Sequence, residues 1–232
     1  MISRYKEALA EARATRGRLQ APKILVPTGV CVVALTIAIA LGVVFGSPTH
    51  ASSQFQEDGG ITKFSALLMA VASLLALATF VFSRSRPRRS AWFWILAALA
   101  FAYFAFDEVA QVHERIGGFM RNENASSGIF RNWNDIVVIL YGVGAIFVCG
   151  AFLPEILRLP RFGLMIAVAG FFYVAHTAID SVFTRSDLSV MVEESSKLFS
   201  AGFFAIAFLT SAIGIRRLHE LPSAPTPDGE SP

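Results

Sequence analysis

The sequence has few charged residues and almost no cysteine. Asp, Glu, Lys and Arg together make up 16% of the 232 residues, where about 25% is usual in soluble domains. This composition excludes a coiled coil, a disordered chain and a nucleic-acid-binding domain, all of which are rich in charge. The two cysteines, Cys31 and Cys149, lie in apolar runs. They exclude a disulfide scaffold and a cysteine-based zinc site.

Apolar residues are correspondingly abundant, at 54% of the chain with 21 Phe. A helix needs about 20 apolar residues to cross the ~30 Å hydrocarbon core of a bilayer. Runs that reach or approach this length cover residues 24–46, 61–83, 91–112, 134–153, 162–183 and 191–214. Because the runs do not alternate apolar with polar residues, a transmembrane barrel is excluded. We therefore predict an all-α, polytopic membrane protein with six transmembrane helices.

The basic residues predict the orientation of these helices. Lys and Arg concentrate within residues 1–23, 84–89, 158–161 and 216–217, which all fall on one side of a chain with six spans. Since such residues favour the cytoplasmic side, both termini are expected to be cytoplasmic, with the protein in a bacterial inner membrane. The predicted domains are a basic segment (1–23), a six-helix domain (24–215) and a disordered tail (216–232).

Two segments outside the spans allow alternative interpretations. Residues 2–20 mix apolar and basic side chains, which suits either a helix on an anionic leaflet or a frayed basic tail. Residues 113–133 are polar and are expected to form an exposed outer loop, which could dock a membrane protein partner.

Ionisable residues within the spans gather near the outer end. With ~1.5 Å rise per residue, Asp107 lies roughly 22 Å and His176 roughly 21 Å above the inner boundary, and Lys197 lies roughly 9 Å below the outer one. Three spans thus place ionisable groups at one depth. Because such residues are costly in a membrane unless they face a cavity or each other, we expect an outward-facing polar cavity.

A divalent metal site is the first hypothesis for this cavity. His176 and Asp180 are spaced i, i+4 and share a helix face, and carboxylates of two further spans could complete the coordination. The candidate ligands are Asp107, Glu108, His176, Asp180, Glu193 and Glu194. A set of His and carboxylates suits zinc, iron or manganese. With an open position for water, such a site could support hydrolysis of a lipid or an outer-side substrate.

Lys197 and Glu114 are the candidate catalytic groups. Glu114 shares a helix face with Asp107. Lys197 can pair locally with Glu193 or Glu194, or across the cavity with Asp107, where it would act as a counter-ion or a general acid. The matching depths favour Asp107 as its partner.

Two other functions fit the same residues. In the first, the charges only neutralise one another within a non-catalytic accessory or scaffold subunit. The pairs expected in that case are Asp107–His176, Glu193–Lys197 and Asp180–Arg185. The second is a proton- or ion-coupled transporter, since buried carboxylates and His form proton relays. The expected partners are the lipid bilayer and a lipid substrate or a membrane protein, and no nucleic acid.

Two segments resemble a pattern in small polytopic bacterial membrane proteins of uncharacterised function. In residues 106–114 an Asp-Glu…His-Glu sequence closes one span, and in residues 192–197 a Glu-Glu pair opens a later one. In those relatives another carboxylate usually stands where Lys197 stands here. A looser comparison is with metal-dependent membrane hydrolases related to alkaline ceramidases. Their paired His residues on the last span are replaced here by Glu193 and Glu194, so no catalytic residue is carried over from them.

Overall fold

The computed structural model describes residues 2–16, 23–83, 88–123, 133–159 and 161–220. Its regular elements in these ranges are all helical, which confirms the predicted all-α class. They are α1 (Ile2–Arg16), α2 (Leu25–Val44), the 3₁₀ turn η1 (Ala51–Phe55), α3 (Gly60–Phe82), α4 (Arg88–Ala110), α5 (Val112–Glu123), α6 (Trp133–Ala151), α7 (Leu153–Arg158), α8 (Phe162–Val182) and α9 (Asp187–Glu220).

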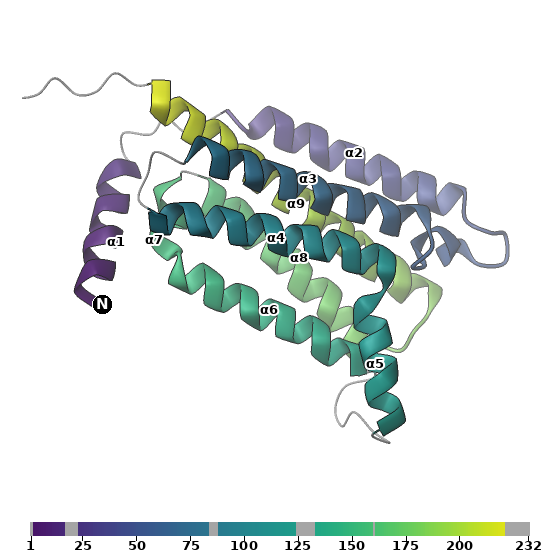
Figure 1. Ribbon diagram of the computed structural model, residues 1–232. Helices are drawn as coiled ribbons and strands as arrows, with labels where there is room; N and C mark the ends of the chain where they lie inside the picture. Colours follow the sequence, from purple (N-terminus) through teal and green to yellow (C-terminus); the bar gives the residue numbers. More distant parts are fainter. Residues whose placement is uncertain (1, 17–22, 84–87, 124–132, 160, 221–232) are drawn as a thin grey trace, which may run out of the picture.

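The long helices form a bundle with their axes roughly side by side (Figure 1). Among the described residues, α2, α3, α4, α8 and α9 are long and apolar enough to cross a membrane, whereas the apolar stretch of α6, Ile136–Ala151, is shorter. The chain is therefore a helical membrane protein. That all six of the predicted spans cross the membrane stays a prediction.

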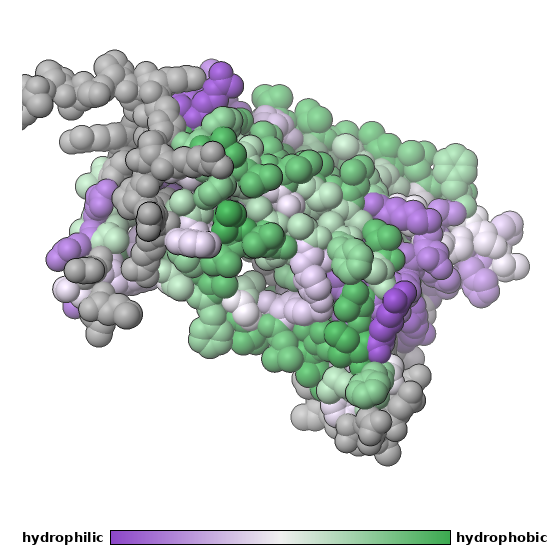
Figure 2. Space-filling model, viewed as in Figure 1, coloured by the Kyte–Doolittle hydropathy of each residue, from purple (hydrophilic) through white to green (hydrophobic). Residues whose placement is uncertain are grey.

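Helix α9 lies at the centre of the bundle. It packs against α3, α8 and α2, and it is the most buried of the candidate spans. Small residues allow this close approach, since Ala201 and Ala207 are fully buried. At Gly202 a Cβ atom would lie 2.6 Å from Leu35 Cδ1, so Leu35 on α2 packs closely against the backbone of α9 at this position. The outward faces of the helices are mostly apolar, as lipid contact requires (Figure 2).

Helix α1 crosses one end of the bundle (Figure 1). The Tyr5 hydroxyl donates to the Gly150 carbonyl over 3.0 Å, and Arg158 forms an ion pair with Glu11 at 3.2 Å. The prediction of a helix within residues 2–20 is therefore confirmed for Ile2–Arg16. Its contact with an anionic leaflet stays a prediction.

The opposite end of the bundle differs from the expectation of an exposed loop over residues 113–133. Gln111 takes a left-handed conformation, with φ of 53°, and breaks the helix that would otherwise continue from α4. The chain then forms α5, which packs against α6. The sequence indicated a loop because this segment is polar, but packing against α6 and a cap from Asp107 stabilise a helix there. The remainder, residues 124–132, lies outside the described residues.

Candidate functional site

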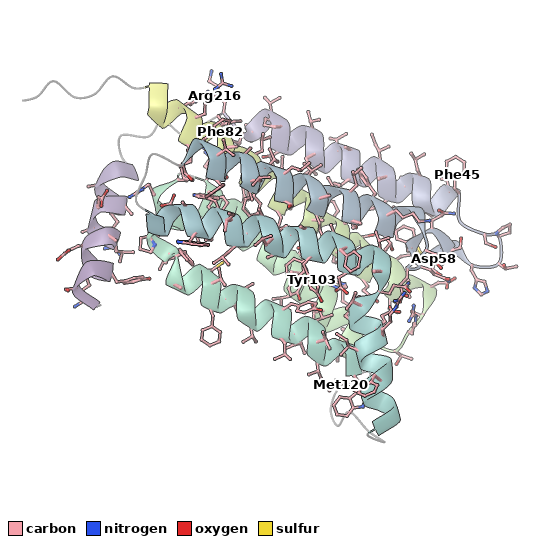
Figure 3. All side chains as sticks on the ribbon, viewed as in Figure 1. Phe45, Asp58, Phe82, Tyr103, Met120 and Arg216 are labelled. Atoms are coloured by element: carbon pink, nitrogen blue, oxygen red, sulfur yellow. The ribbon has the colours of Figure 1, made fainter. Side chains whose placement is uncertain are left out.

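A layer of polar and charged side chains occupies the end of the bundle opposite α1. We call it the charged layer. It comprises Glu57, Thr62, Asp107, Glu108, Gln111, His113, Glu114, Glu194 and Lys197. Figure 2 shows hydrophilic residues gathered at this end, and Figure 3 places Asp58, next to Glu57 in the chain, on the same side. The layer is thus built by the loop after η1 and by α3, α4, α5 and α9.

Lys197 joins three helices of the bundle. Its Nζ lies 2.5 Å from Glu108 Oε1 on α4 and 2.6 Å from Glu194 Oε1 one turn earlier on α9. The other oxygen of Glu194 accepts a hydrogen bond from Thr62 on α3 at 3.1 Å. The side chains of Lys197, Glu108 and Glu194 are only 12%, 11% and 6% exposed.

These contacts correct the predicted partners of Lys197. The local partner is Glu194, not Glu193, and the partner across the bundle is Glu108 instead of Asp107. The predicted depth of Lys197 was correct. The predicted partner was wrong because adjacent residues on a helix, such as Asp107 and Glu108, point about 100° apart around its axis. One ammonium group thus faces two carboxylates, so the cluster carries a net negative charge unless it holds a further proton.

Asp107 stabilises the break between α4 and α5. Its carboxylate accepts hydrogen bonds from the backbone N–H of His113 at 2.9 Å and pairs with His113 Nδ1 at 3.0 Å. Burial alone would lower the pKa of His113, but the hydrogen bond and negative charge of Asp107 raise the pKa overall. Asp107 therefore pairs with His113, and not with His176 as the structural alternative expected.

Glu114 forms a carboxyl–carboxylate pair with Glu57. The two side chains are hydrogen-bonded to each other, and Gln111 Nε2 donates to Glu57 Oε2 at 2.8 Å. Burial, reinforced by Glu57, raises the pKa of Glu114 from its ordinary value of 4.5 to about 8. Glu114 therefore holds its proton near neutral pH, hydrogen-bonded to Glu57.

The remaining predicted metal ligands are His176, Asp180 and Glu193, and His176 lies within electrostatic range of Lys197 and His113. His176 Nδ1 is buried without a hydrogen-bond partner, and its ring centroid lies 6.3 Å from that of Tyr173. Glu193 lies within electrostatic range of Asp180. Within the ranges that the structure describes, no group of three or more His, Cys, Asp or Glu side chains could hold a metal ion. A zinc, iron or manganese site therefore stays a prediction.

Sequence reasoning missed Glu57 and Thr62 of the charged layer, and a second polar cluster. Glu57 follows the first span on the outer side, but nothing in its spacing connects it with Glu114. At the α1 end, buried Glu155 accepts a hydrogen bond from Trp94 Nε1 at 3.2 Å and lies 3.5 Å from Arg158. The only sequence signal there was a Glu three residues before an Arg, which is typical of an exposed helix pair.

Together these observations define a helical membrane protein with a partly buried charged layer at one end. The chain belongs to the family described as Domain of unknown function (DUF8692), whose model matches residues 24–212. The matched range includes the charged layer and leaves out α1. No curated protein and no solved structure matches the chain.

Proposed function

We propose that this is a proton-coupled membrane protein, in which the charged layer takes up and releases a proton near neutral pH. The observation that carries the proposal is the hydrogen-bonded pair of Glu57 and Glu114. A pair of carboxyl groups with one shared proton changes its charge when the pH crosses the raised pKa.

The ionisable groups near Glu57 and Glu114 support a charged layer in which the protonation of one group affects the others. Glu108 and Glu194 share Lys197, and the negative charges of Glu108 and Glu114 act on His113. Loss of a proton from one group therefore changes the electrostatic energy of the others. Buried carboxylates and His in this arrangement are typical of proton-handling membrane proteins.

The break between α4 and α5 couples the proton to a movement. Gln111 is the residue with positive φ at the break, and it also binds Glu57. When Glu57 and Glu114 are both ionised, their repulsion favours separation of α5 from the loop after η1. The pH then selects between two positions of α5, as a two-state switch requires.

The proposal also includes the membrane in which the protein lies and its orientation there. We place the protein in a bacterial inner membrane as a multi-pass protein with α1 and both termini on the cytoplasmic side. The exposed basic residues Lys6 and Arg13 on α1 support this orientation. The charged layer then faces outside, where the pH varies most.

Hydrolysis at a divalent metal is less well supported than proton coupling, because several of the predicted metal ligands already have other partners. Among the six predicted ligands, Glu108 and Glu194 are engaged by Lys197 and Asp107 by His113. A non-catalytic accessory role is favoured by one observation, the double pairing of buried Lys197, which links α4 to α9. That role predicts no response of α5 to pH.

A distance measurement by spin labels tests the proposal. The labels are attached at Ala51→Cys in η1 and Gly118→Cys in α5, in a Cys31→Ala/Cys149→Ala background reconstituted in vesicles. We expect the distance to lengthen as the pH rises from about 6 to about 9, across the raised pKa of Glu114. The change should be lost in Glu114→Gln and kept in Glu7→Gln, a matched change of an exposed carboxylate on α1.

The accessory role predicts a different result. An unchanged distance between pH 6 and pH 9, or an equal change in Glu114→Gln, would rule out proton coupling through this pair.

A further inference from the structure

Helices α4 and α6 are separated along the middle of the bundle. Helix α6 packs mainly against α5 and α8, and Figure 2 shows the surface hollowed between α4 and α6. On the side of α6 that carries Tyr141, Gly144, Ala145 and Val148 are exposed, and a Cβ atom at Gly144 would meet nothing within 4 Å. On α4, Leu96 and Leu99 are 42% and 65% exposed. We call this opening the α4–α6 window.

Aromatic contacts close both ends of the window. At the α1 end, the ring centroids of Phe93 and Phe152 lie 5.5 Å apart. Toward the charged layer, the hydroxyl groups of Tyr103 and Tyr141 are hydrogen-bonded at 2.7 Å. In Figure 3 Tyr103 lies between the two helices. From Phe93 to Tyr103 the helix rises roughly 15 Å, so the window has the length of a hydrocarbon chain segment.

The tyrosine pair provides a hydrogen-bond donor inside the window. Two hydroxyl groups carry two protons, and only one of them is used in the bond between Tyr103 and Tyr141. Within the described part of the chain, the other proton has no acceptor. Since an unpaired hydroxyl in a hydrocarbon environment is costly, a bound molecule with a carbonyl oxygen would be stabilised here.

The depth of the pair limits the kind of headgroup. Tyr103 lies seven residues before the end of α4 at Ala110, which corresponds to roughly 10 Å below that end. A charged headgroup at this depth is costly, whereas an ester carbonyl is uncharged and its polarity is satisfied by one hydrogen bond. We propose that the α4–α6 window binds one chain of a neutral acyl lipid, whose carbonyl oxygen accepts the free proton of the Tyr103–Tyr141 pair.

Photolabelling in vesicles of phosphatidylcholine tests this site. The probe is a diacylglycerol with a photoreactive group in one acyl chain, and the comparison is phosphatidylcholine with the same labelled chain. We expect the diacylglycerol probe to label residues 92–103 and 141–148 in the wild-type protein, and unlabelled diacylglycerol to compete. Uniform labelling of all lipid-facing helices, or equal labelling by both probes, would overturn the proposal, because it would indicate ordinary surrounding lipid.

Three variants make the test specific to the window. Gly144→Phe fills the window and should abolish the competed labelling, whereas Gly29→Phe places the same side chain in open space on α2 and should leave it unchanged. The double variant Tyr103→Phe/Tyr141→Phe should weaken diacylglycerol labelling about fivefold, the factor that one neutral hydrogen bond supplies. Equal labelling of Gly144→Phe and Gly29→Phe would place the lipid elsewhere. Labelling that the double variant leaves unchanged would contradict the role of the tyrosines.

Discussion

At the scale of single residues, Lys197 connects α4 and α9 through two ion pairs. Its ammonium group lies within 2.6 Å of carboxylates on two helices. Removal of one partner from a buried ion pair is strongly destabilising, because the remaining charge is left without water or a counter-ion. Here the loss of Lys197 would leave two carboxylates unpaired.

Lys197→Met is therefore expected to lower the free energy of unfolding by about 3–5 kcal/mol. Denaturant titration of the protein in detergent micelles measures this change. Lys63→Met is the matched control, because Lys63 is exposed on α3 near the same end, and it should change stability by less than about 1 kcal/mol.

Adding Glu108→Gln to Lys197→Met should restore part of the lost stability, since it removes one of the unpaired charges. A Lys197→Met protein as stable as Lys63→Met would show that the ion pairs contribute nothing measurable to the bundle.

At the scale of the helices, apolar length predicted the spans well. The run 162–183 corresponds to α8, Phe162–Val182, and the run 61–83 to α3, Gly60–Phe82, because the ends of apolar runs set where a helix can leave the membrane. The last run, 191–214, was too short: α9 begins at Asp187 and continues to Glu220. Polar residues at both ends extend this helix, and a hydropathy pattern does not count them.

The depth of a residue along its helix could also be predicted from the sequence, whereas the direction of its side chain around the helix axis could not. The helical rise brought Lys197 to the level of Asp107, yet the contact is made by the adjacent Glu108. The rotation of a helix about its axis depends on which of its faces packs against its neighbours. Because small apolar residues occur on every side of these helices, the sequence does not show which face packs. Glu57 was missed for a different reason, since a loop residue has no periodicity.

The packing of α2 gives a prediction at this scale. Gly202→Ala would place a Cβ atom 2.6 Å from Leu35 Cδ1, so the buried Leu35 side chain must move from its present packing. We expect stability to fall by about 1–3 kcal/mol, measured by the same denaturant titration. Gly29→Ala, on α2 with open space around it, should be neutral or slightly stabilising. Equal stability of the two variants would contradict the close approach of α2 and α9.

At the scale of the whole molecule, the two ends of the bundle differ in chemistry. The α1 end has an ion pair between Arg158 and Glu11 and a buried hydrogen bond between Trp94 and Glu155. The opposite end holds an excess of carboxylates, with the pKa of Glu114 and that of His113 both raised. The charged layer is therefore expected to respond to pH near neutrality.

Stability should consequently fall as the pH rises from about 4.5 to about 8. The folded protein holds a proton on Glu114 up to about pH 8, whereas the unfolded chain loses it near pH 4.5, so the folded state binds more protons across this range. The raised pKa of His113 acts in the same direction. Thermal unfolding across the range measures the slope, which should be shallower in Glu114→Gln and unchanged in Glu7→Gln. Stability that rises with pH would contradict this assignment.

The shared proton of Glu57 and Glu114 is the central claim, and infrared spectroscopy detects it most directly. A protonated carboxyl group has a C=O stretching band that a carboxylate lacks. We predict that this band is present at pH 7, weakens as the pH rises through about 8, and is weaker at pH 7 in Glu114→Gln but not in Glu7→Gln. A wild-type protein with no protonated carboxyl band at pH 7 would contradict the account.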